Sequence, residues 1–264
     1  WTPKALQDWT DFSQRLPQLF DRYDKMGINY AKSVYLVLPK AEMSVEDKTV
    51  SISLTSETPN PDIRYVLGDK KLTSESKRYS EPVVISETTI IKAAVFEDDQ
   101  IMGKMFVDTL KFHKATGKPV DYQTMYSDSY TGQGEYTLTN TVRGSKNFHD
   151  GQWLGWIDND MEVIIDLEQS QEIQKVSVGT LESQGAGIYF PVAVEVSTST
   201  DGVKYEKQGH IERDWKLNVD TELKDFTVKF GPAMARYIKV EVTNLGTPPN
   251  GGGSWLFVDE ILVE

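Results

Sequence analysis

The spacing of hydrophobic residues changes near residue 40, and this change constrains the fold more than any other feature. Before it, large apolar residues recur every three or four positions, which is typical of a helix. After it, apolar and polar residues alternate over short stretches separated by turn residues, which is typical of β-strands. The pattern therefore predicts a mainly β protein preceded by a helical segment. The first strands are expected at residues 49–54, 63–67, 89–96 and 105–112.

The helical segment covers residues 1–35 and carries one apolar stripe. Pro17 lies within it and is expected to break or kink the helix, because proline donates no backbone hydrogen bond. A segment this short cannot build a core alone, so we expect the stripe to pack on another domain. The stripe consists of Leu6, Trp9, Phe12, Leu16, Leu19, Phe20, Tyr23 and Met26.

A second β-rich stretch follows residues 115–119, whose composition is that of a linker. Many short strands separated by polar loops are typical of a sandwich or jelly roll. Three domains are thus predicted: a helical segment at 1–38, a small β-sandwich at 39–116, and a larger β-sandwich jelly roll at 117–264. The further strands are expected at residues 162–167, 172–181, 192–200, 205–212, 226–230, 237–243 and 256–263.

The composition excludes several classes of function. Asp and Glu total 40 against 28 Lys and Arg, a net charge of −12, which does not suit binding to nucleic-acid phosphates or to an anionic membrane surface. The chain has no Cys, which excludes disulfides, thiolate metal sites and cysteine catalysis. No apolar run approaches the ~20 residues of a membrane-spanning helix. We therefore expect neither a nucleic-acid partner nor membrane insertion.

Three segments resemble, in order, parts of one kind of enzyme. Residues 9–16 and 27–30 resemble the last helix of the catalytic barrel in family 20 β-N-acetylhexosaminidases, and residues 62–114 resemble the small β-domain at the C-terminal side of chitobiases and hexosaminidases. Residues 120–264 resemble a coagulation factor 5/8 type C (discoidin-like) domain of carbohydrate-binding module family 32. The segments that carry the last two likenesses are Ile63-Arg64-Tyr65, Thr73, Ser76, Tyr79, Pro82 and Ile91-Lys92-Ala93, then Trp153-Leu154-Gly155-Trp156, Val163-Ile164-Ile165-Asp166-Leu167, Ser199-Thr200-Asp201-Gly202, Arg236-Tyr237-Ile238-Lys239-Val240 and Trp255-Leu256-Phe257-Val258-Asp259-Glu260-Ile261.

This resemblance implies that the chain is a non-catalytic C-terminal fragment of an exported glycosidase. Family 20 hydrolases are expected to use an adjacent Asp-Glu pair, in which the Glu is the general acid and the Asp orients the substrate's acetamido group. Asp259-Glu260 is the one such pair here, and it lies in the expected last strand rather than on a barrel. We therefore expect no catalytic residue and an inactive chain. Its implied location is secreted, in the periplasm or at the cell surface of a bacterium, with the parent's catalytic barrel as a partner.

The third segment implies a glycan partner that contains N-acetylhexosamine or galactose. A sugar ring presents an apolar face and a rim of hydroxyls, so its site needs an exposed aromatic ring and polar side chains. Trp255 follows three glycines and Trp215 follows residues 212–214, which predicts that both lie near loop tips and makes them the first two candidates. Residues 248–250 differ from the Trp-His pair of similar domains, so a structural spacer or protein-interaction module without sugar binding stays open. The other candidates are Trp156, Tyr189 and Arg213.

The same resemblance implies a structural Ca²⁺ near the ends of the third segment. Calcium prefers loop carbonyl and carboxylate oxygens, and the matching positions are Asp150-Gly151 and Glu260. A solvated turn carboxylate and a surface Glu are the open alternative. Asp150 and Glu260 are therefore the candidate metal ligands.

Overall fold

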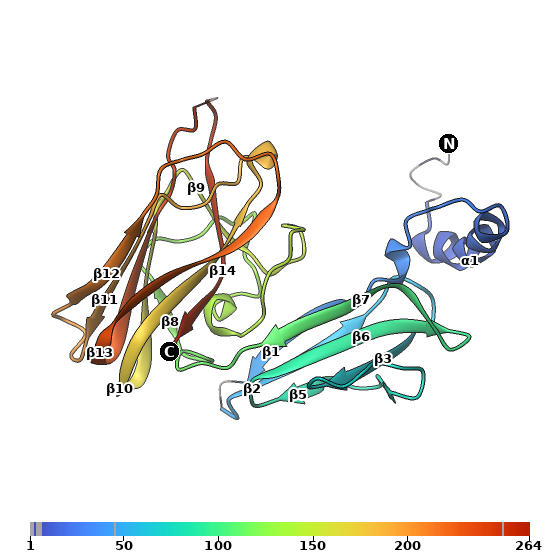
Figure 1. Ribbon diagram of the computed structural model, residues 1–264, viewed down its shortest axis with the longest axis horizontal. Coiled ribbons are helices and arrows are strands. Elements are labelled where there is room, and N and C mark those ends of the chain that lie inside the picture. Colours follow the sequence, from blue (N-terminus) through green and yellow to red (C-terminus); the bar gives the residue numbers. More distant parts are fainter. Residues whose placement is uncertain (1–2, 4–6, 45, 250) are drawn as a thin grey trace. The chain divides into compact units, whose positions relative to one another are not determined.

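The computed structural model describes residues 3, 7–44, 46–249 and 251–264. They form two compact units (Figure 1). One unit contains the chain up to Lys40 together with Ser51–Thr109, and the other contains Ala41–Val50 and Leu110–Glu264. Most of the regular structure is β-strand, so the predicted mainly β fold class is confirmed. Within the described ranges, no helix is both long and apolar enough to cross a bilayer.

One α-helix, α1 (Trp9–Lys25), precedes the strands of the first unit. The break predicted at Pro17 is wrong, because the helix continues through this residue. A proline removes one backbone hydrogen bond, and contacts made by the next turn can offset that loss. Here Phe20 is buried and stacks on Tyr30, with 4.6 Å between the ring centroids. The helix is also shorter than the predicted residues 1–35.

The apolar stripe of α1 is divided between a buried and an open face. Phe20 faces the protein, whereas Trp9 is 55% and Phe12 44% exposed. Leu16 and Leu19 are half-buried, and Leu6 lies outside the described residues. Within the first unit, the stripe is therefore only partly covered.

Two small sheets are formed by the strands that precede Leu110 (Figure 1). One has the order β1-β2-β5 and the other the order β4-β3-β6-β7. Alternation in the sequence becomes alternation in burial: Ile52 and Leu54 of β2 are buried, and Ser53 between them is only partly so. The strands are β1 (Leu38–Ser44), β2 (Thr49–Thr55), β3 (Asp62–Leu67), β4 (Lys77–Arg78), β5 (Val83–Ile85), β6 (Thr89–Glu97) and β7 (Gln100–Leu110).

Two long antiparallel strands, β10 (Met161–Glu182) and β13 (Glu222–Thr243), form the centre of the sheet in the second unit. The sequence pattern predicts each as two shorter strands, because polar residues interrupt the alternation. In the structure this interruption is a β-bulge between Asp166 and Gln171, with Glu168 at a φ of 65°, and the pairing resumes beyond it. The sheet order is β12-β11-β13-β10-β14-β9, and β8 also pairs with β10. The other strands are β8 (Val120–Tyr122), β9 (Leu154–Ile157), β11 (Ala193–Ser199), β12 (Glu206–Glu212) and β14 (Trp255–Val263).

Every second residue of these strands points into one core. Val194 and Val196 of β11 lie in it, and so do Ile238 and Val240 of β13, as the alternation in the sequence predicts. Short 3₁₀ turns lie between strands of this unit at Thr137–Thr139 and Gln184–Ala186, and another, Ser33–Tyr35, lies between α1 and β1 in the first unit. The remaining core residues come mainly from β10, β13 and β14, which leaves the loops at the strand ends for other roles.

The segment at residues 115–119 is not an exposed linker. Ala115 is fully buried, and Thr116 and Lys118 are 9% and 8% exposed. The Lys118 ammonium pairs with Glu168, and the backbone N–H of Lys114 donates to the carbonyl of Val263. The segment is therefore part of the second unit.

A buried His113–Glu260 pair joins this segment to β14. Both side chains are fully buried, and His113 Nε2 lies 2.9 Å from Glu260 Oε1. The Nδ1 atom accepts the backbone N–H of Ala115, so Nε2 carries the ring proton and donates to Glu260. Burial lowers the pKa of His113 to about 3. Burial, together with the nearby Asp259 carboxyl, raises the pKa of Glu260.

The His113→Gln variant tests how this pair responds to pH. A His in the unfolded chain titrates near pH 6.5, so as the pH falls below 6.5 the unfolded state binds a proton that folded His113 refuses. We expect His113 to remove about 1.4 kcal/mol of unfolding free energy per pH unit in this range. The raised pKa of Glu260 acts in the opposite sense, since the stability it contributes is lost as the pH rises.

The measurement is urea unfolding followed by tryptophan fluorescence from pH 7.5 to 4.5. The variant keeps an amide N–H for Glu260 but does not titrate, so we expect it to lose less stability on acidification than the native chain. His149→Gln, which removes an exposed histidine, is the control. Parallel pH profiles for the native chain and His113→Gln would contradict the assignment.

Candidate functional site

The candidate site lies at the end of the second unit where β14 begins (Figure 1). Trp255, the first residue of β14, is half-buried. Its backbone N–H donates to the carbonyl of Gly187, and its carbonyl accepts the N–H of Tyr189, both at 2.9 Å. At the base of the preceding loop, Ser254 N donates to Asp158 Oδ1 at 2.7 Å. Trp255 is thus held between two loops, with part of its ring open.

Three further aromatic side chains gather beside Trp255. Tyr130 lies edge-on to Trp255 at a centroid distance of 5.1 Å and stacks on His149 at 6.1 Å. Phe148 contacts Tyr130 at 6.4 Å and His149 at 4.2 Å. His149 is exposed, and the other three are half-buried. We call these four residues, Tyr130, Phe148, His149 and Trp255, the aromatic shelf.

Gly155 explains how the rings reach the sheet. This glycine of β9 pairs with Phe257, and a Cβ placed on it would lie 2.8 Å from the Phe257 ring, 3.0 Å from Tyr130 Cβ and 3.2 Å from the Trp255 ring. A side chain at this position would push the rings away from the strand. Its absence lets the shelf pack directly on β9.

Sequence reasoning selected Trp255 but missed Tyr130, Phe148 and His149. A signal was present, because Phe148 and His149 directly precede the turn Asp150-Gly151. Adjacent aromatic residues at a turn lie near a loop tip, where recognition residues concentrate. The place of Tyr130 could not be inferred, since its neighbours in space come from other strands and loops.

Trp215 and Arg213 lie on the other side of the turn at residues 183–188. Gln184 of this turn donates from Nε2 to the carbonyl of Lys216 at 2.7 Å, while Gly187 accepts from Trp255. Trp215 is half-buried, and its indole Nε1 has no hydrogen-bond partner among the described residues. The structure therefore brings Trp255 and Trp215 to the same end of the unit, as the sequence predicts for loop-tip residues.

The Arg213 side chain rests on an aromatic ring. Its guanidinium carbon lies 5.6 Å from the centroid of Phe190, and Nη1 donates to the carbonyl of that residue at 3.4 Å. Nη1 also lies 4.0 Å from Glu182 Oε1. Among the described residues, these contacts involve only Nη1 and the face of the guanidinium, and they give the Arg213 head a fixed position.

Two other sugar-site candidates lie in the interior. Trp156 is 1% exposed and belongs to the main core, where its Nε1 donates to the carbonyl of Thr124 at 3.0 Å. Tyr189 is 4% exposed. A ring enclosed on both faces cannot stack on a sugar, so these two residues serve packing. Both residues lie near the ends of strand-like stretches, where a side chain can belong either to the core or to a loop. The sequence therefore could not distinguish these buried aromatic residues from exposed ones.

The two candidate metal ligands already accept hydrogen bonds from the protein. Asp150 accepts the backbone N–H of Ser145 at 2.6 Å and that of Gln152 at 3.0 Å, one on each oxygen. Glu260 accepts from His113 and, at 2.9 Å, from the N–H of Thr141. N–H donors on every one of these oxygens are the wrong partners for a cation, so the two carboxylates do not fit Ca²⁺. Among the described residues, no cluster of three or more His, Asp or Glu side chains has the arrangement of a metal site.

The Asp259-Glu260 pair is also inaccessible. Both residues are fully buried in β14, and Asp259 is paired with Arg143. A glycosidic oxygen cannot approach carboxyls in this position. The pair therefore has a structural place in the second unit.

The fold and its loop-end site define a discoidin-like β-sandwich module. Residues 123–261 match the F5/8 type C domain family, and residues 52–110 match the Fn3 associated family. The first match spans more than half of the chain, which therefore belongs to the F5/8 type C domain family. None of the curated proteins compared matches the chain.

Solved structures are similar at low identity. Chitosan-binding module 1 from the chitosanase/glucanase of Paenibacillus sp. IK-5 is 16% identical, with a TM-score of 0.38, over 58% of this chain and 98% of that module. The CBM32-5 module of Clostridium perfringens, solved with GalNAc-β-1,3-galactose, is 20% identical, with a TM-score of 0.36, over 55% of this chain and 92% of that one. CBM32-1 from a family 31 glycoside hydrolase of Clostridium perfringens is 20% identical, with a TM-score of 0.36, over 55% and 91%.

Alanine substitutions distinguish the core tryptophan from the loop tryptophan. We expect Trp156→Ala to cost about 3–5 kcal/mol of unfolding free energy, because it empties a buried site. We expect Trp215→Ala to cost less than half of that, because its ring is already partly in water. Urea unfolding of both variants measures the difference. Equal losses would show that Trp215 is a core residue too.

Proposed function

We propose that the second unit binds a glycan at its loop end, with the aromatic shelf as the platform. The observation that carries this proposal is the convergence of Tyr130, His149 and Trp255 from three separate parts of the chain, with all three rings partly or fully exposed. The apolar face of a sugar ring packs on such rings, and the hydroxyls need polar groups around them. The glycan class that the family resemblance suggests contains N-acetylhexosamine or galactose.

Arg213 and Trp215 are proposed to extend this site beyond the turn at residues 183–188. A guanidinium offers five N–H donors, and those of Arg213 are held in place by Phe190. Trp215 contributes a second partly open ring. A glycan longer than one sugar would contact the shelf with one residue and this area with another.

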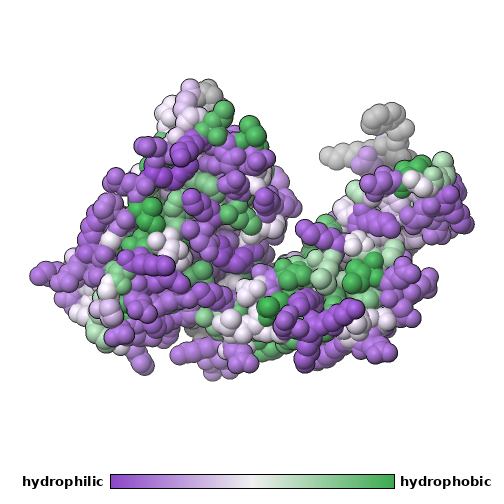
Figure 2. Space-filling model, viewed as in Figure 1, coloured by the Kyte–Doolittle hydropathy of each residue, from purple (hydrophilic) through white to green (hydrophobic). Residues whose placement is uncertain are grey.

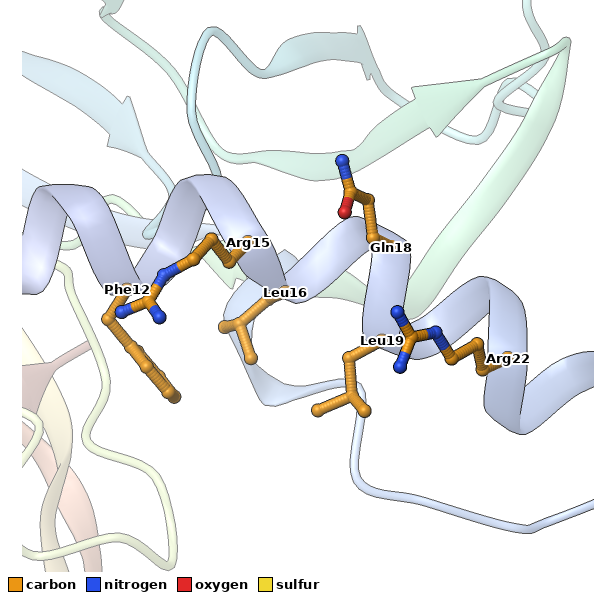
Figure 3. Close-up of a pocket in the computed structure, with 6 residues that line it drawn as sticks. All are labelled: Phe12, Arg15, Leu16, Gln18, Leu19 and Arg22. Carbon is orange, nitrogen blue, oxygen red and sulfur yellow. The ribbon is translucent and has the colours of Figure 1, made fainter. Parts of the chain in front are cut away.

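We further propose that the chain is the non-catalytic C-terminal part of an exported bacterial β-N-acetylhexosaminidase, and that the module targets the parent enzyme to glycans. The three resembling segments occur in the order expected for such an enzyme. The open face of α1 also supports a missing neighbour, since a shallow groove of about 290 Å³ runs along it (Figure 3). The parent's catalytic barrel is the partner proposed for this groove. Its lining residues are Phe12, Arg15, Leu16, Gln18, Leu19 and Arg22.

A spacer or protein-interaction module without sugar binding is the second candidate function. Leu217 is 75% and Val219 90% exposed in the loop between β12 and β13. Neighbouring exposed apolar side chains at a loop tip suit contact with a protein surface. A glycan array distinguishes the two functions, because only the first predicts a saccharide ligand.

Trp255→Ala tests the glycan platform. For a single sugar-binding module we expect a dissociation constant between about 1 mM and 1 μM. Loss of one stacked ring removes about 1–3 kcal/mol, so binding weakens roughly 5- to 150-fold. Titration calorimetry with a glycan selected on the array measures the change. Trp9→Ala, which removes an exposed ring from the first unit, is the matched control and retains binding.

Unchanged affinity of Trp255→Ala would move the site away from the shelf. A drop in melting temperature as large as that of Trp156→Ala would instead mean that the ring acts in the core. His149→Ala separates these outcomes, because His149 is an exposed member of the shelf and its loss leaves the packing of β14 intact. A loss of affinity in this variant therefore reports on the site and not on the core.

The chain alone is expected not to hydrolyse an aryl β-N-acetylglucosaminide. The only adjacent Asp-Glu pair is buried and bonded within the second unit. A chromogenic assay of the pure chain measures turnover. Turnover that survives Glu260→Gln would reveal a catalytic site elsewhere and would contradict the proposed non-catalytic role.

A further inference from the structure

The loop at residues 140–153 connects the candidate site to the buried strand β14. Its far end carries Phe148 and His149 of the aromatic shelf. Its near end is attached to β14, where Thr141 N donates to Glu260 and Gly144 N donates to Asp259 Oδ2 at 2.8 Å. The position of the shelf residues on this loop therefore depends on how firmly β14 holds its near end.

Arg143 makes the strongest attachment at this end. Its Nε lies 2.8 Å from Asp259 Oδ2, and its Nη2 lies 2.6 Å from Asp225 Oδ1 on β13. The Asp259 side chain is 1% exposed, that of Arg143 is 27% exposed and that of Asp225 is 41% exposed. One guanidinium thus joins the loop, β14 and β13.

The surrounding backbone is shaped around this guanidinium. A Cβ on Gly179 of β10 would collide with Asp259 Oδ1 and Arg143 Nη2, so β10 passes directly beneath the ion pair. Burial alone would lower the pKa of Arg143, but the carboxylates of Asp259 and Asp225 outweigh burial and raise it. Burial raises the pKa of Asp259, and Arg143 opposes that rise. The buried carboxylate depends on a cation, and Arg143 provides one.

A divalent metal does not fit the same acceptors. Asp259 Oδ2 already accepts from Arg143 Nε and Gly144 N, and both oxygens of Glu260 accept N–H groups. The two carboxylates that the resemblance assigns to Ca²⁺ are Asp150 and Glu260, and both oxygens of each accept N–H groups of the protein itself. Three buried oxygens near this junction, Asp259 Oδ1, Thr141 Oγ1 and Gln152 Oε1, have no hydrogen-bond partner within the described ranges. Asp259 Oδ1 faces Gly179 beside the Arg143 guanidinium, so the cation nearest to it is that of Arg143.

We propose that the guanidinium of Arg143 is the built-in cation of this junction, balances the buried Asp259 carboxylate without a metal ion, and positions the loop that carries Phe148 and His149. The unit is then independent of calcium. Only the value of this positioning for binding rests on the proposed glycan site, since the cation and the hold on the loop concern the second unit alone.

The first test compares melting temperatures in EDTA and in millimolar CaCl₂. We expect the native chain to melt at the same temperature in both, because a ligand that binds only the folded state would raise it. We expect Arg143→Met to melt lower by on the order of 10 °C in both, because removing one partner leaves Asp259 as a buried unpaired charge. A matched control is Arg236→Met, which removes a two-pronged pair with Asp166 on the same sheet.

The Arg236–Asp166 pair is more exposed than the Arg143–Asp259 pair, so we expect Arg236→Met to lower the melting temperature by no more than a few degrees. Two results would overturn the proposal. One is a calcium-dependent rise in the melting temperature of the native chain. The other is an Arg143→Met variant that melts no lower than Arg236→Met.

The second test measures the loop itself. Lys146 lies exposed in the loop, so the rate of trypsin cleavage after it reports how well the loop is held. We expect Arg143→Met to be cleaved at least tenfold faster there at a temperature where the variant is folded, and Arg143→Lys to recover part of the protection. EDTA is expected to leave the rate of the native chain unchanged. Equal rates in the native chain and Arg143→Met would overturn the positioning role, whether or not a glycan binds.

If Arg143→Met does not fold, Asp225→Asn takes its place. This variant keeps the buried Arg143–Asp259 pair and removes only the charge of Asp225, the more exposed partner of Arg143. We expect this variant to fold and to be cleaved after Lys146 faster than the native chain and Arg236→Met. A rate equal to that of the native chain would contradict the bridge to β13. Calorimetric titration of the native chain with CaCl₂ needs no variant, and heat of binding at a stoichiometric site would overturn the built-in cation.

Discussion

The pairing of β10 with β13 is the constraint on which the second unit depends. The two strands run antiparallel over nearly their whole lengths, and every other strand of the sheet except β12 and β9 pairs directly with one of them. The bulge near Glu168 bends β10 without ending the ladder. Because β14 pairs with β10, and Asp225 lies on β13, both the shelf and the Arg143 bridge take their positions from this pair.

The elements that could be predicted from the sequence are those with a local period. The sequence pattern located β2, β3, β6, β11 and β14 to within two residues. Burial alternates along β2 and β3, whereas β14 is buried on both faces after Trp255. The same criterion divided β10 into two strands, since Glu168 and its polar neighbours interrupt the alternation while the backbone pairing continues. Pro17 shows the converse failure: a strong local signal for a helix break was overridden by the packing of Phe20 on Tyr30.

The candidate site could be predicted only in part, because it is built from contacts between loops distant in the sequence. A tryptophan after a glycine run was recognisable, whereas its contact with Tyr130 depends on β9, β14 and the close approach that Gly155 permits. Asp150 and Glu260 follow from the family resemblance alone, and in the structure both carboxylates accept backbone N–H groups. Hydrophilic residues cover much of the face seen in Figure 2, so composition gave little help in finding one site among them.

The position of β14 in the sheet has a consequence for the order in which the chain is made. β14 pairs with β10 on one side and β9 on the other, although it follows both along the chain. At a synthesis rate of 5–20 residues per second, roughly 4–16 s pass between the synthesis of the end of β10 and that of the end of β14. During that time its edge and the apolar side chains that β14 will cover are open to other chains. This unit therefore cannot complete its sheet on the ribosome until β14 has been made. A translation product interrupted before β14 would expose the unpaired, aggregation-prone edge of β10.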